Sequence, residues 1–398
     1  MIYLRFIITI YVSLSMEMII KEMILWQSNY ITRYVESTMG SDNIRWEISK
    51  MLNVGLDWDL WHRKLYGSVD FFKEWRSDVL VNRSSIPTLL GVTAPQDSYG
   101  KIESHGGELM IGHTNRIGQV KYYIEALLSW NKSKLIDIDE VERQYDYQYR
   151  TGKRIGQAYM FKFTQWASDE ALIPTSYEDA VAHPEKYPWS TYGTYKLGNA
   201  VFQDANGDRQ ITIDDQIALG YNTVYDPIPE LTPSLKLGVE WKGFDARAIL
   251  TAYLNRTAIC RENMDYGFGW GGTSTHAITH TWGYFTDDPN DPRNVNAWYP
   301  RLSAGGFSPI DRNDDTRTSD IWLVNGDYLS LRNIEVGYSF PRSWISAIGM
   351  TKLRLYFSAY NICNWSHLPK GFDPENPTNY VWSYPKTKSF TFGLNVSF

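Results

Sequence analysis

The chain has 398 residues, enough for one large domain or two to three smaller ones, and a formal net charge of −6. This acidic balance argues against a nucleic-acid-binding protein, which normally carries a basic face. An aromatic content of 15%, with 28 Tyr and 16 Trp, fits membrane barrels and sugar-binding β proteins alike, whereas a mean hydropathy of −0.39 excludes a bundle of membrane helices.

The first forty residues admit three interpretations. Residues 6–16 are apolar and follow Arg5, as in a signal peptide, but charged residues come directly afterwards and no small-residue cleavage pattern is present. The same stretch alternates apolar and polar residues, which is typical of a barrel strand. An unstructured leader is the third interpretation. We therefore separate a leader-like segment 1–40, which contains a possible strand, from a main domain 41–398.

Alternation of apolar and polar residues recurs along the main domain. Since strand side chains point alternately to opposite faces, each such segment predicts a strand with one apolar face. The segments are 52–60, 65–72, 120–130, 235–241, 246–254, 353–359 and 388–398, with weaker ones at 100–114 and 327–340. The pattern blurs around Arg332 and Asn333, where a β-bulge would fit. About nine strands are predicted, or ten with the amino-terminal candidate.

The connections between these strands fall into two length classes that alternate along the chain. The short ones are 61–64, 115–118, 242–243 and 341–350, and the long ones are 81–99, 138–232, 257–318 and 364–386. Outer-membrane barrels have short periplasmic turns and long extracellular loops. The sequence therefore predicts an all-β protein, a transmembrane antiparallel β-barrel whose long loops are extracellular.

The long connection 138–232 contains one segment with the spacing of a calcium loop. Oxygen ligands at loop positions 1, 3, 5, 7, 9 and 12 surround Ca²⁺ in such loops, with a backbone carbonyl at position 7. Those positions are here Asp204, Asn206, Asp208, Gln210, Thr212 and Asp215. Arg209 replaces the usual glycine at position 6, and an aspartate replaces the usual glutamate at position 12. Calcium binding and a merely Asp-rich polar turn are both open.

Other possible sites have weaker signals. His276 and His280 are four residues apart, as on a zinc helix, but Ala277 stands where the general base of that motif belongs. The carboxylates and tryptophans of the loops could supply a glycosidase, but sequence does not place two carboxylates across a cleft. Cys260 and Cys363 lack a metal-type spacing and are interpreted as free thiols, although they could pair. We expect no enzymatic activity and no catalytic residue.

Several loop aromatics could stack on sugar rings or peptides, or pack the loops together instead. These are Trp270, Trp282, Trp298, Tyr299 and Trp382. The final strand is the clearest segment of the chain. Phe390, Phe392, Leu394, Val396 and Phe398 lie on one face, and the residues between them are polar or glycine. A membrane strand of about 10 residues with one apolar face has this pattern.

Longer motifs resemble those of the SusC/RagA family of TonB-dependent outer-membrane transporters. The resemblance rests on Asn296–Leu302, on Ser319–Leu323 followed by Asp327–Tyr338, on Gly371–Glu375, and on the closing segment Tyr384–Phe398. Ile44–Glu47, Asn53–Asp57 and Gly67–Phe72 are similar to it as well. It covers roughly residues 40–398, and residues 1–40 match poorly.

The resemblance implies the carboxy-terminal part of a larger plugged barrel, in the class of about 22 strands. It further implies a location in the outer membrane, contact with its lipid, and import of oligosaccharide or peptide fragments. A SusD-like surface lipoprotein, the TonB complex acting through an amino-terminal part, and the barrel-assembly machinery reading Phe398 are the implied partners. No plug and no TonB box is recognised in this chain, so it is expected to be a fragment, the product of a split gene, or a chain with a misassigned start. Two alternatives remain open: a stand-alone small outer-membrane channel or assembly-impaired fragment, and a soluble secreted β-rich carbohydrate-binding protein or hydrolase.

Overall fold

The computed structural model describes most of the chain. The described residues are 2–13, 40–85, 94–220, 228–259, 283–286, 288–298, 300–301, 319–368, 373–376 and 386–398. The chain forms two compact units. The first contains Met1–His113, Ala126–Gln144 and Tyr149–Ile155, and the second contains Thr114–Glu125, Tyr145–Gln148 and Gly156–Phe398.

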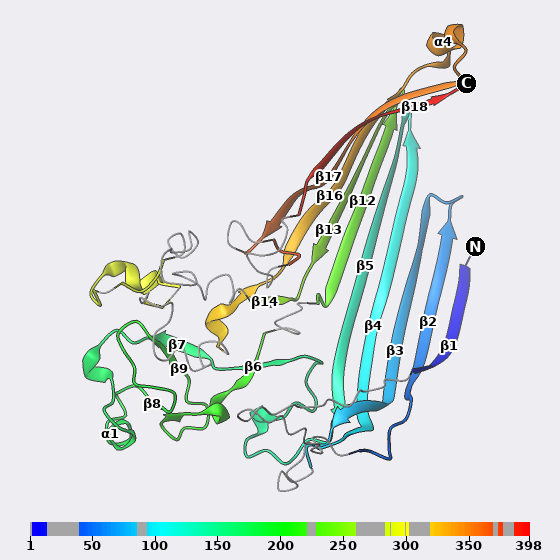
Figure 1. Ribbon diagram of the computed structural model, residues 1–398. Coiled ribbons are helices and arrows are strands. Elements are labelled where there is room, and N and C mark those ends of the chain that lie inside the picture. Colours follow the sequence, from blue (N-terminus) through cyan, green and yellow to red (C-terminus); the bar gives the residue numbers. More distant parts are fainter. Residues whose placement is uncertain are drawn as a thin grey trace, which may run out of the picture. The chain divides into compact units, whose positions relative to one another are not determined.

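Ten strands have the sheet order β1-β2-β3-β4-β5-β12-β13-β16-β17-β18 (Figure 1). Their bounds are β1 (Ile2–Ser13), β2 (Glu47–Leu60), β3 (Leu65–Asn82), β4 (Gln96–Ile117), β5 (Val120–Asp137), β12 (Leu231–Trp241), β13 (Phe244–Tyr253), β16 (Tyr328–Ser339), β17 (Lys352–Ser366) and β18 (Ser389–Ser397). All nine strands predicted in the main domain are present. Strand β1 occupies part of the stretch for which a strand, a signal peptide and a leader were considered.

The register between strands contains irregularities where the sequence pattern blurs. Pairing of β16 with β17 shifts between Leu331 and Asn333, which confirms the predicted bulge. The pairing of β13 with β16 shifts at the neighbouring Ile249 and Leu250. An extra residue in one strand bends the ladder locally and increases its twist, and the alternation of faces resumes on either side.

The short connections are tight turns. Lys242 and Gly243 join β12 to β13 with φ values of 47° and 87°, as the two-residue hairpin turns that match strand twist require. In the first unit, the β2–β3 turn contains three successive non-glycine residues with positive φ, Trp61, His62 and Arg63. The β16–β17 connection contains the short helices α4 (Arg342–Ile345) and η8 (Ser346–Ile348).

The long connections contain short elements that the alternation of residues does not reveal. The strands are β6 (Ala158–Met160), β7 (Phe163–Trp166), β8 (Trp189–Ser190), β9 (Ala200–Phe202), β10 (Gln210–Ile211), β11 (Ile217–Leu219), β14 (Thr257–Ile259) and β15 (Leu323–Asn325). The helices are α1 (Tyr177–Ala182), η2 (Asp146–Gln148), η3 (Glu170–Leu172), η4 (Ile213–Asp215), η5 (Pro292–Asn296) and η7 (Asp320–Trp322). Small sheets form from the pairs β6–β11, β7–β9, β8–β10 and β14–β15.

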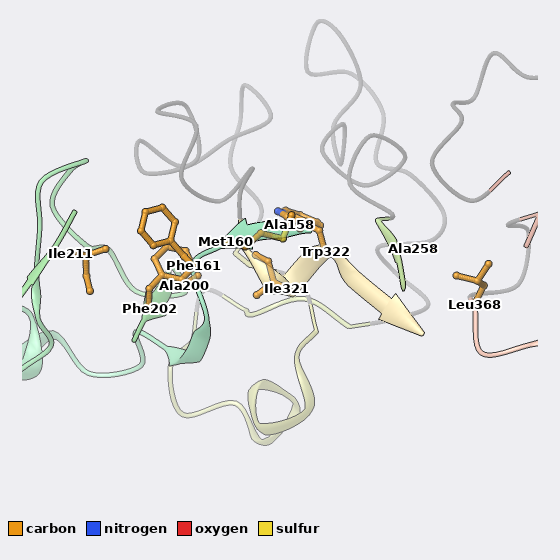
Figure 2. Close-up of a cluster of buried hydrophobic side chains, with 10 residues drawn as sticks. All are labelled: Ala158, Met160, Phe161, Ala200, Phe202, Ile211, Ala258, Ile321, Trp322 and Leu368. Carbon is orange, nitrogen blue, oxygen red and sulfur yellow. The ribbon is translucent and has the colours of Figure 1, made fainter. Parts of the chain in front are cut away.

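Several of these short elements, among them β6, β9, β10, β14 and η7, contribute to one hydrophobic core (Figure 2). Its buried members include Phe161, which is fully buried, and Trp322, which is 3% exposed. The others are Ala158, Met160, Ala200, Phe202, Ile211, Ala258, Ile321 and Leu368. Each large apolar side chain that is fully buried contributes roughly 1.5–3 kcal/mol to folding. Because several are buried here, the long connections are folded and packed in part. No helix among the described residues is long and apolar enough to span a membrane.

Candidate functional site

The sheet of the second unit has one apolar face. Residues directly opposite each other on paired strands lie on the same face, so the register shows which side chains belong to each face of the sheet. Three successive rows across β12, β13, β16, β17 and β18 are entirely apolar. They are Trp241–Phe244–Tyr338–Leu355–Leu394, Val239–Ala246–Val336–Phe357–Phe392 and Leu237–Ala248–Ile334–Ala359–Phe390. Several of these side chains are open to the surroundings, with Phe392 84% exposed and Phe244 53% exposed.

The rows between them, on the opposite face, are polar. They are Glu240–Asp245–Gly337–Tyr356–Gly393 and Gly238–Arg247–Glu335–Ser358–Thr391. Arg354 Nε donates to Asp245 Oδ1 at 3.0 Å, and its Nη2 donates to Glu335 Oε1 at 2.6 Å. The guanidinium also lies over the Tyr356 ring, 5.1 Å from its centroid. This polar face is therefore held by a connected charge network rather than by an apolar core.

The sheet of the first unit has the same two faces. Leu56, Val69 and Leu109 are register partners on one face, and Gly55, Asp70 and Glu108 are partners on the other. On the polar face, Ser49 Oγ donates to Glu74 Oε1 at 2.6 Å and Arg76 Nε donates to the same oxygen at 2.8 Å. Each unit, taken by itself, therefore presents an apolar and a polar surface.

The predicted calcium loop is an ordered turn built around Asp204. Asp204 Oδ1 accepts hydrogen bonds from the backbone N–H groups of Gly207 at 2.7 Å and Asp208 at 3.2 Å, and Oδ2 accepts one from the N–H of Arg209 at 2.8 Å. Asn206 Nδ2 donates to Asp208 Oδ2 at 2.9 Å, which brings loop positions 3 and 5 together. Asp208 Oδ1 accepts from the N–H of Gln210 at 2.8 Å. The first four predicted ligand residues, Asp204, Asn206, Asp208 and Gln210, thus belong to one hydrogen-bonded turn.

The last predicted ligands close this loop. Asp215 accepts hydrogen bonds from the N–H groups of Ala205 and Thr212, both at 2.8 Å, so its carboxylate ties the two ends of the loop together. Thr212 caps η4 and forms a capping box with Asp215. Asp215 is 1% exposed, and this burial raises the pKa of its carboxyl group. The nearby negative charge of Asp204 raises the same pKa further.

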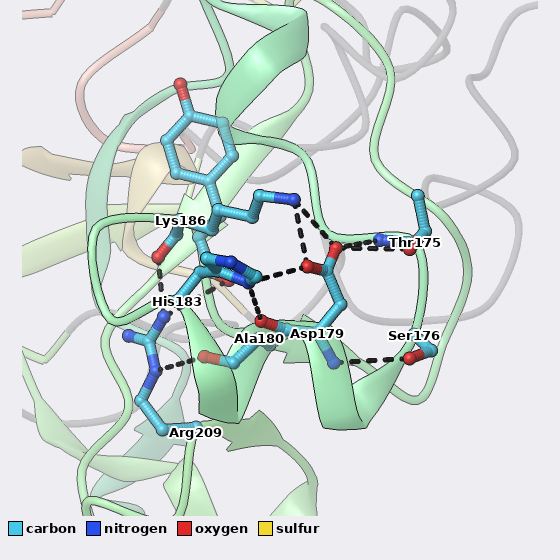
Figure 3. Close-up of polar contacts among 8 residues, drawn as sticks. Thr175, Ser176, Asp179, Ala180, His183, Lys186 and Arg209 are labelled. Atoms are coloured by element: carbon cyan, nitrogen blue, oxygen red, sulfur yellow. Dashed lines mark hydrogen bonds and ion pairs between the residues drawn. The ribbon is translucent and has the colours of Figure 1, made fainter.

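Arg209 explains how the loop does without glycine at its sixth position. Its φ is 66°, the left-handed region that glycine normally supplies. The guanidinium donates to the carbonyl of Ala180 at 3.2 Å and to that of Lys186 at 2.6 Å, which holds the residue in place (Figure 3). In the sequence, Arg209 is a departure from the calcium-loop pattern, and its hydrogen bonds to the Ala180 and Lys186 carbonyls could not be predicted.

Arg209 donates to the carbonyl of Ala180 in helix α1, and Asp179 of the same helix holds its surroundings in place. Asp179 accepts hydrogen bonds from Lys186 Nζ at 2.8 Å and from Thr175 N at 2.8 Å, and His183 Nδ1 lies 2.9 Å from its other carboxylate oxygen (Figure 3). The ammonium of Lys186 and the N–H of Thr175 hold the pKa of the Asp179 carboxyl well below its usual range. Ser176 caps α1 by accepting from the N–H of Asp179. The Ser-x-x-Asp spacing was the available sequence signal for this helix start.

Tyr147 links η2 to the same loop. Its hydroxyl donates to the carbonyl of Asp214 at 2.8 Å, and Gln148 Nε2 donates to Asp214 Oδ1 at 2.9 Å. Burial, together with the charges of Asp215 and Asp214, raises the pKa of Tyr147 to about 12. Within the described residues, no group of three or more His, Cys, Asp or Glu side chains has the arrangement of a metal site. This statement includes the three carboxylates of the predicted loop, Asp204, Asp208 and Asp215.

Most of the other sequence candidates lie outside the described residues. This applies to His276, His280 and Cys260, and to Trp270, Trp282, Tyr299 and Trp382. Trp298 is described and packs against the hydrophobic core of the loops, which is the packing role considered for these aromatics. Cys363 is a free cysteine in β17.

Comparisons with known proteins find similar chains among the TonB-dependent receptors. No family model matches the chain. TonB-dependent receptor P3 of Formosa agariphila is 26% identical over 92% of this chain, and TonB-dependent receptor SusC of Bacteroides thetaiotaomicron is 23% identical over 90% of it. These matches cover 35% and 32% of the two receptors, so the chain spans about a third of the length of the relatives it matches.

Solved structures give the same result for the fold. A chain in the structure of the RagAB peptide transporter matches 100% of this chain with a TM-score of 0.68 at 19% identity, and 41% of that chain is covered. The RagAB peptide importer in its open-open state matches 95% of this chain with a TM-score of 0.64 at 18% identity, over 38% of that chain. The predicted fold class and the resemblance to SusC/RagA transporters are confirmed. The matched proteins are named as receptors and transporters, which also confirms the expectation of a non-enzymatic protein.

Proposed function

We propose that the chain is the carboxy-terminal barrel part of a SusC/RagA-like TonB-dependent receptor of the outer membrane, and that the intact receptor imports glycan or peptide fragments. Its similarity to TonB-dependent receptors over about nine-tenths of its length supports this function. The same similarity assigns the chain to the outer membrane. The chain itself would supply strands and loops for ligand passage, with no residue in a catalytic role.

The alignment of apolar residues across five strands is the structural observation that carries the proposal. A barrel in lipid needs a continuous apolar band outside and tolerates polar residues towards the lumen. Exposed side chains such as Phe392 and Phe244 would be covered by hydrocarbon, at a gain of roughly 25 cal/mol for each Å² removed from water. The charge network of Arg354 on the other face would line the lumen.

The proposed partners follow from the same assignment. A SusD-like surface lipoprotein would cap the long connections, and the TonB complex would act through an amino-terminal part of the intact receptor. The barrel-assembly machinery would read the last strand, where the terminal Phe398 is 82% exposed. The long connections contain folded elements with a core of their own, and this supports a role in ligand or partner recognition rather than in simple linkage.

Spin labelling in lipid vesicles tests the proposal. Cys260 and Cys363 are replaced by serine, and single labels are placed at Leu394 and, as the matched control, at the adjacent Asn395 on the opposite face. We expect the Leu394 label to be relaxed by lipid-soluble oxygen and the Asn395 label by an aqueous nickel complex. If nickel reaches Leu394 as readily as Asn395, the chain does not sit in lipid and a soluble β-rich protein is the better interpretation.

We also propose that the Asp204 loop binds Ca²⁺. Asp204, Asn206, Asp208, Gln210, Thr212 and Asp215 would hold the ion, with Gln210 contributing its backbone carbonyl. The winding of the loop around Asp204 and the buried carboxylate of Asp215 support the fit. A bound cation would stabilise the ionised form of Asp215, which burial alone disfavours.

Calorimetric titration with CaCl₂ tests this second proposal. Wild-type chain should bind calcium, and Asp204→Asn should abolish the binding because it removes the central carboxylate. Asp42→Asn, at an exposed position of the first unit, is the control and should leave it unchanged. Equal heats from wild type and Asp204→Asn would show that the loop is a polar turn only.

A further inference from the structure

The connection between β16 and β17 carries an exposed tryptophan beyond the end of the sheet. Figure 1 shows α4 of this connection at the end of the sheet where β18 finishes. Trp344 of α4 is 66% exposed and Ile348 of η8 is 62% exposed, whereas Ile345 between them is 3% exposed. Two large apolar side chains of this connection therefore point outwards, while a third is buried beneath them.

A line of four aromatic rings joins Trp344 to the apolar face of the sheet. The ring centroids are 4.6 Å apart for Phe244 and Tyr338, 5.0 Å apart for Tyr338 and Phe340, and 6.4 Å apart for Phe340 and Trp344. Phe244 and Tyr338 are register partners in one of the apolar rows described above. The apolar face of the sheet therefore continues onto the connection, and a continuous exposed apolar surface marks contact with a protein or a membrane.

Backbone hydrogen bonds fix the connection against the ends of the strands. The N–H of Phe340 donates to the carbonyl of Leu353 at 2.9 Å, and the N–H of Thr351 donates to the carbonyl of Ser397 in β18 at 2.7 Å. Gly349, with a φ of 77°, ends η8 in the left-handed region and turns the chain towards β17. The fold of this unit therefore sets the distance of Trp344 from the apolar rows.

The charges of the connection are all positive. The segment 339–354 contains Arg342, Lys352 and Arg354 and no acidic residue. Arg354 belongs to the charge network of the polar face, whereas Arg342 and Lys352 are exposed. Lys242 is exposed in the turn between β12 and β13, at the same end of the paired strands. Basic residues beside an apolar surface are attracted to the anionic phosphates of a lipid bilayer.

We propose that α4 and η8 lie in the phospholipid headgroup layer at the short-turn end of the barrel. Trp344 and Ile348 would sit at the boundary between headgroups and hydrocarbon, and Arg342 and Lys352 would contact lipid phosphates. Tryptophan prefers this boundary because its ring is amphipathic. The continuous line of rings from the apolar rows, together with the positive charge, favours lipid over a protein partner. The inference rests on the proposed receptor function and identifies a segment that anchors the barrel at one membrane surface.

Spin labels on the full chain in vesicles of phosphatidylethanolamine and phosphatidylglycerol test this contact. Cys260 and Cys363 are replaced by serine, and single labels are placed through Ile348→Cys and, as the matched control, Ser346→Cys. Residues two apart on a helical turn do not share a face. A lipid that carries nickel on its headgroup should relax the label at 348 more strongly than the label at 346. A soluble nickel complex should show the opposite preference.

Substitutions then test the side chains that would hold the segment in place. Trp344→Ala, and separately Arg342→Gln/Lys352→Gln, should lower the relaxation of the 348 label by the nickel lipid about twofold or more. Lys388→Gln, an exposed lysine before the opposite end of β18, is the control for the lost charges and should leave the relaxation unchanged. Circular dichroism checks the fold, since all of these substitutions change exposed side chains.

Three results would overturn the headgroup contact. They are equal relaxation of the labels at 348 and 346 by the nickel lipid, shielding of the 348 label from both nickel reagents and from oxygen, and an unchanged 348 label in both Trp344→Ala and the charge variant. Shielding from every reagent would identify a protein, such as a second copy of this chain, as the occupant. Because the receptor function is tested at Leu394, a lipid-exposed Leu394 label beside a water-exposed 348 label rejects the headgroup contact and leaves the receptor function standing.

Discussion

Arg209 combines an unfavourable backbone conformation with favourable side-chain contacts. A non-glycine residue in the left-handed region costs about 1 kcal/mol, whereas hydrogen bonds from a charged group contribute about 2 kcal/mol. We expect Arg209→Ala to lower the opening free energy of the 204–215 loop by about 2 kcal/mol, because the contacts to Ala180 and Lys186 are lost and the strain stays. Hydrogen exchange of the Gly207 and Asp208 amides measures this opening.

Arg209→Gly separates the two contributions. It loses the same guanidinium contacts but removes the strain, so its amides should exchange more slowly than those of Arg209→Ala by a margin of about 1 kcal/mol. Lys162→Ala, an exposed lysine in the same unit, serves as control and should exchange like the wild type. Identical exchange in Arg209→Gly and Arg209→Ala would show that φ at this position carries no cost.

Asp179 makes the α1 segment sensitive to acid. Because Lys186 and Thr175 lower its pKa below the ordinary 3.8, the folded segment binds fewer protons than the unfolded one. The stabilisation is therefore complete above the ordinary pKa and is lost as the pH falls through the lowered value. We expect proteolysis of this segment to accelerate as the pH decreases from about 5 to below 3.8. Asp179→Asn should be cleaved faster at neutral pH and show a smaller acid response, and an unchanged response would rule out Asp179 as its source.

At the scale of the strand, glycine makes room for the charge network of the polar face. An added Cβ at Gly337 would lie 2.6 Å from Arg354 Nη2, so the guanidinium would have to leave Asp245 and Glu335. Arg354 and Asp245 are largely buried, and breaking a buried ion pair costs about 3 kcal/mol or more. Gly337→Ala should therefore lower the urea midpoint of the folded chain in detergent.

Gly40→Ala is the matched control for this substitution. Among the described residues, an added Cβ at Gly40 meets nothing within 4 Å, and the φ of Gly40 is not in the left-handed region, so the urea midpoint should stay at the wild-type value. A midpoint for Gly337→Ala equal to that of Gly40→Ala would mean that Arg354 can move without loss. The network would then contribute no measurable stability to the folded chain.

The strands themselves could be predicted because their faces meet different surroundings. An apolar face and a polar face impose a period of two on the sequence, and even the bulge beside Asn333 disturbs that period visibly. Strand ends were less accurate. β4 begins at Gln96 and ends at Ile117, beyond the predicted 100–114, because hydrogen bonding to neighbours continues where the alternation fades.

At the scale of the whole molecule, the long connections were the part that sequence reasoning described least. Elements such as β9 and β10 are two or three residues long, too short for any period to appear. Their core depends on contacts between segments far apart in the sequence, such as the hydrogen bond from Phe163 N to Asp320 Oδ1 at 2.6 Å. The calcium-like spacing could be predicted, but the anchoring of Arg209 on α1 could not.

The connection 254–327 leaves the sheet and returns to it at a single pair of residues. Tyr253 and Tyr328 are direct register partners, and their rings stack with centroids 4.8 Å apart. The entropy of closing an excursion grows only logarithmically with its length, by about 0.6 kcal/mol for each doubling. Insertions and deletions between Tyr253 and Tyr328 should therefore change the stability of the β13–β16 pairing very little. Related chains can therefore differ in the length and sequence of this connection while they keep the same tyrosine pair at its base.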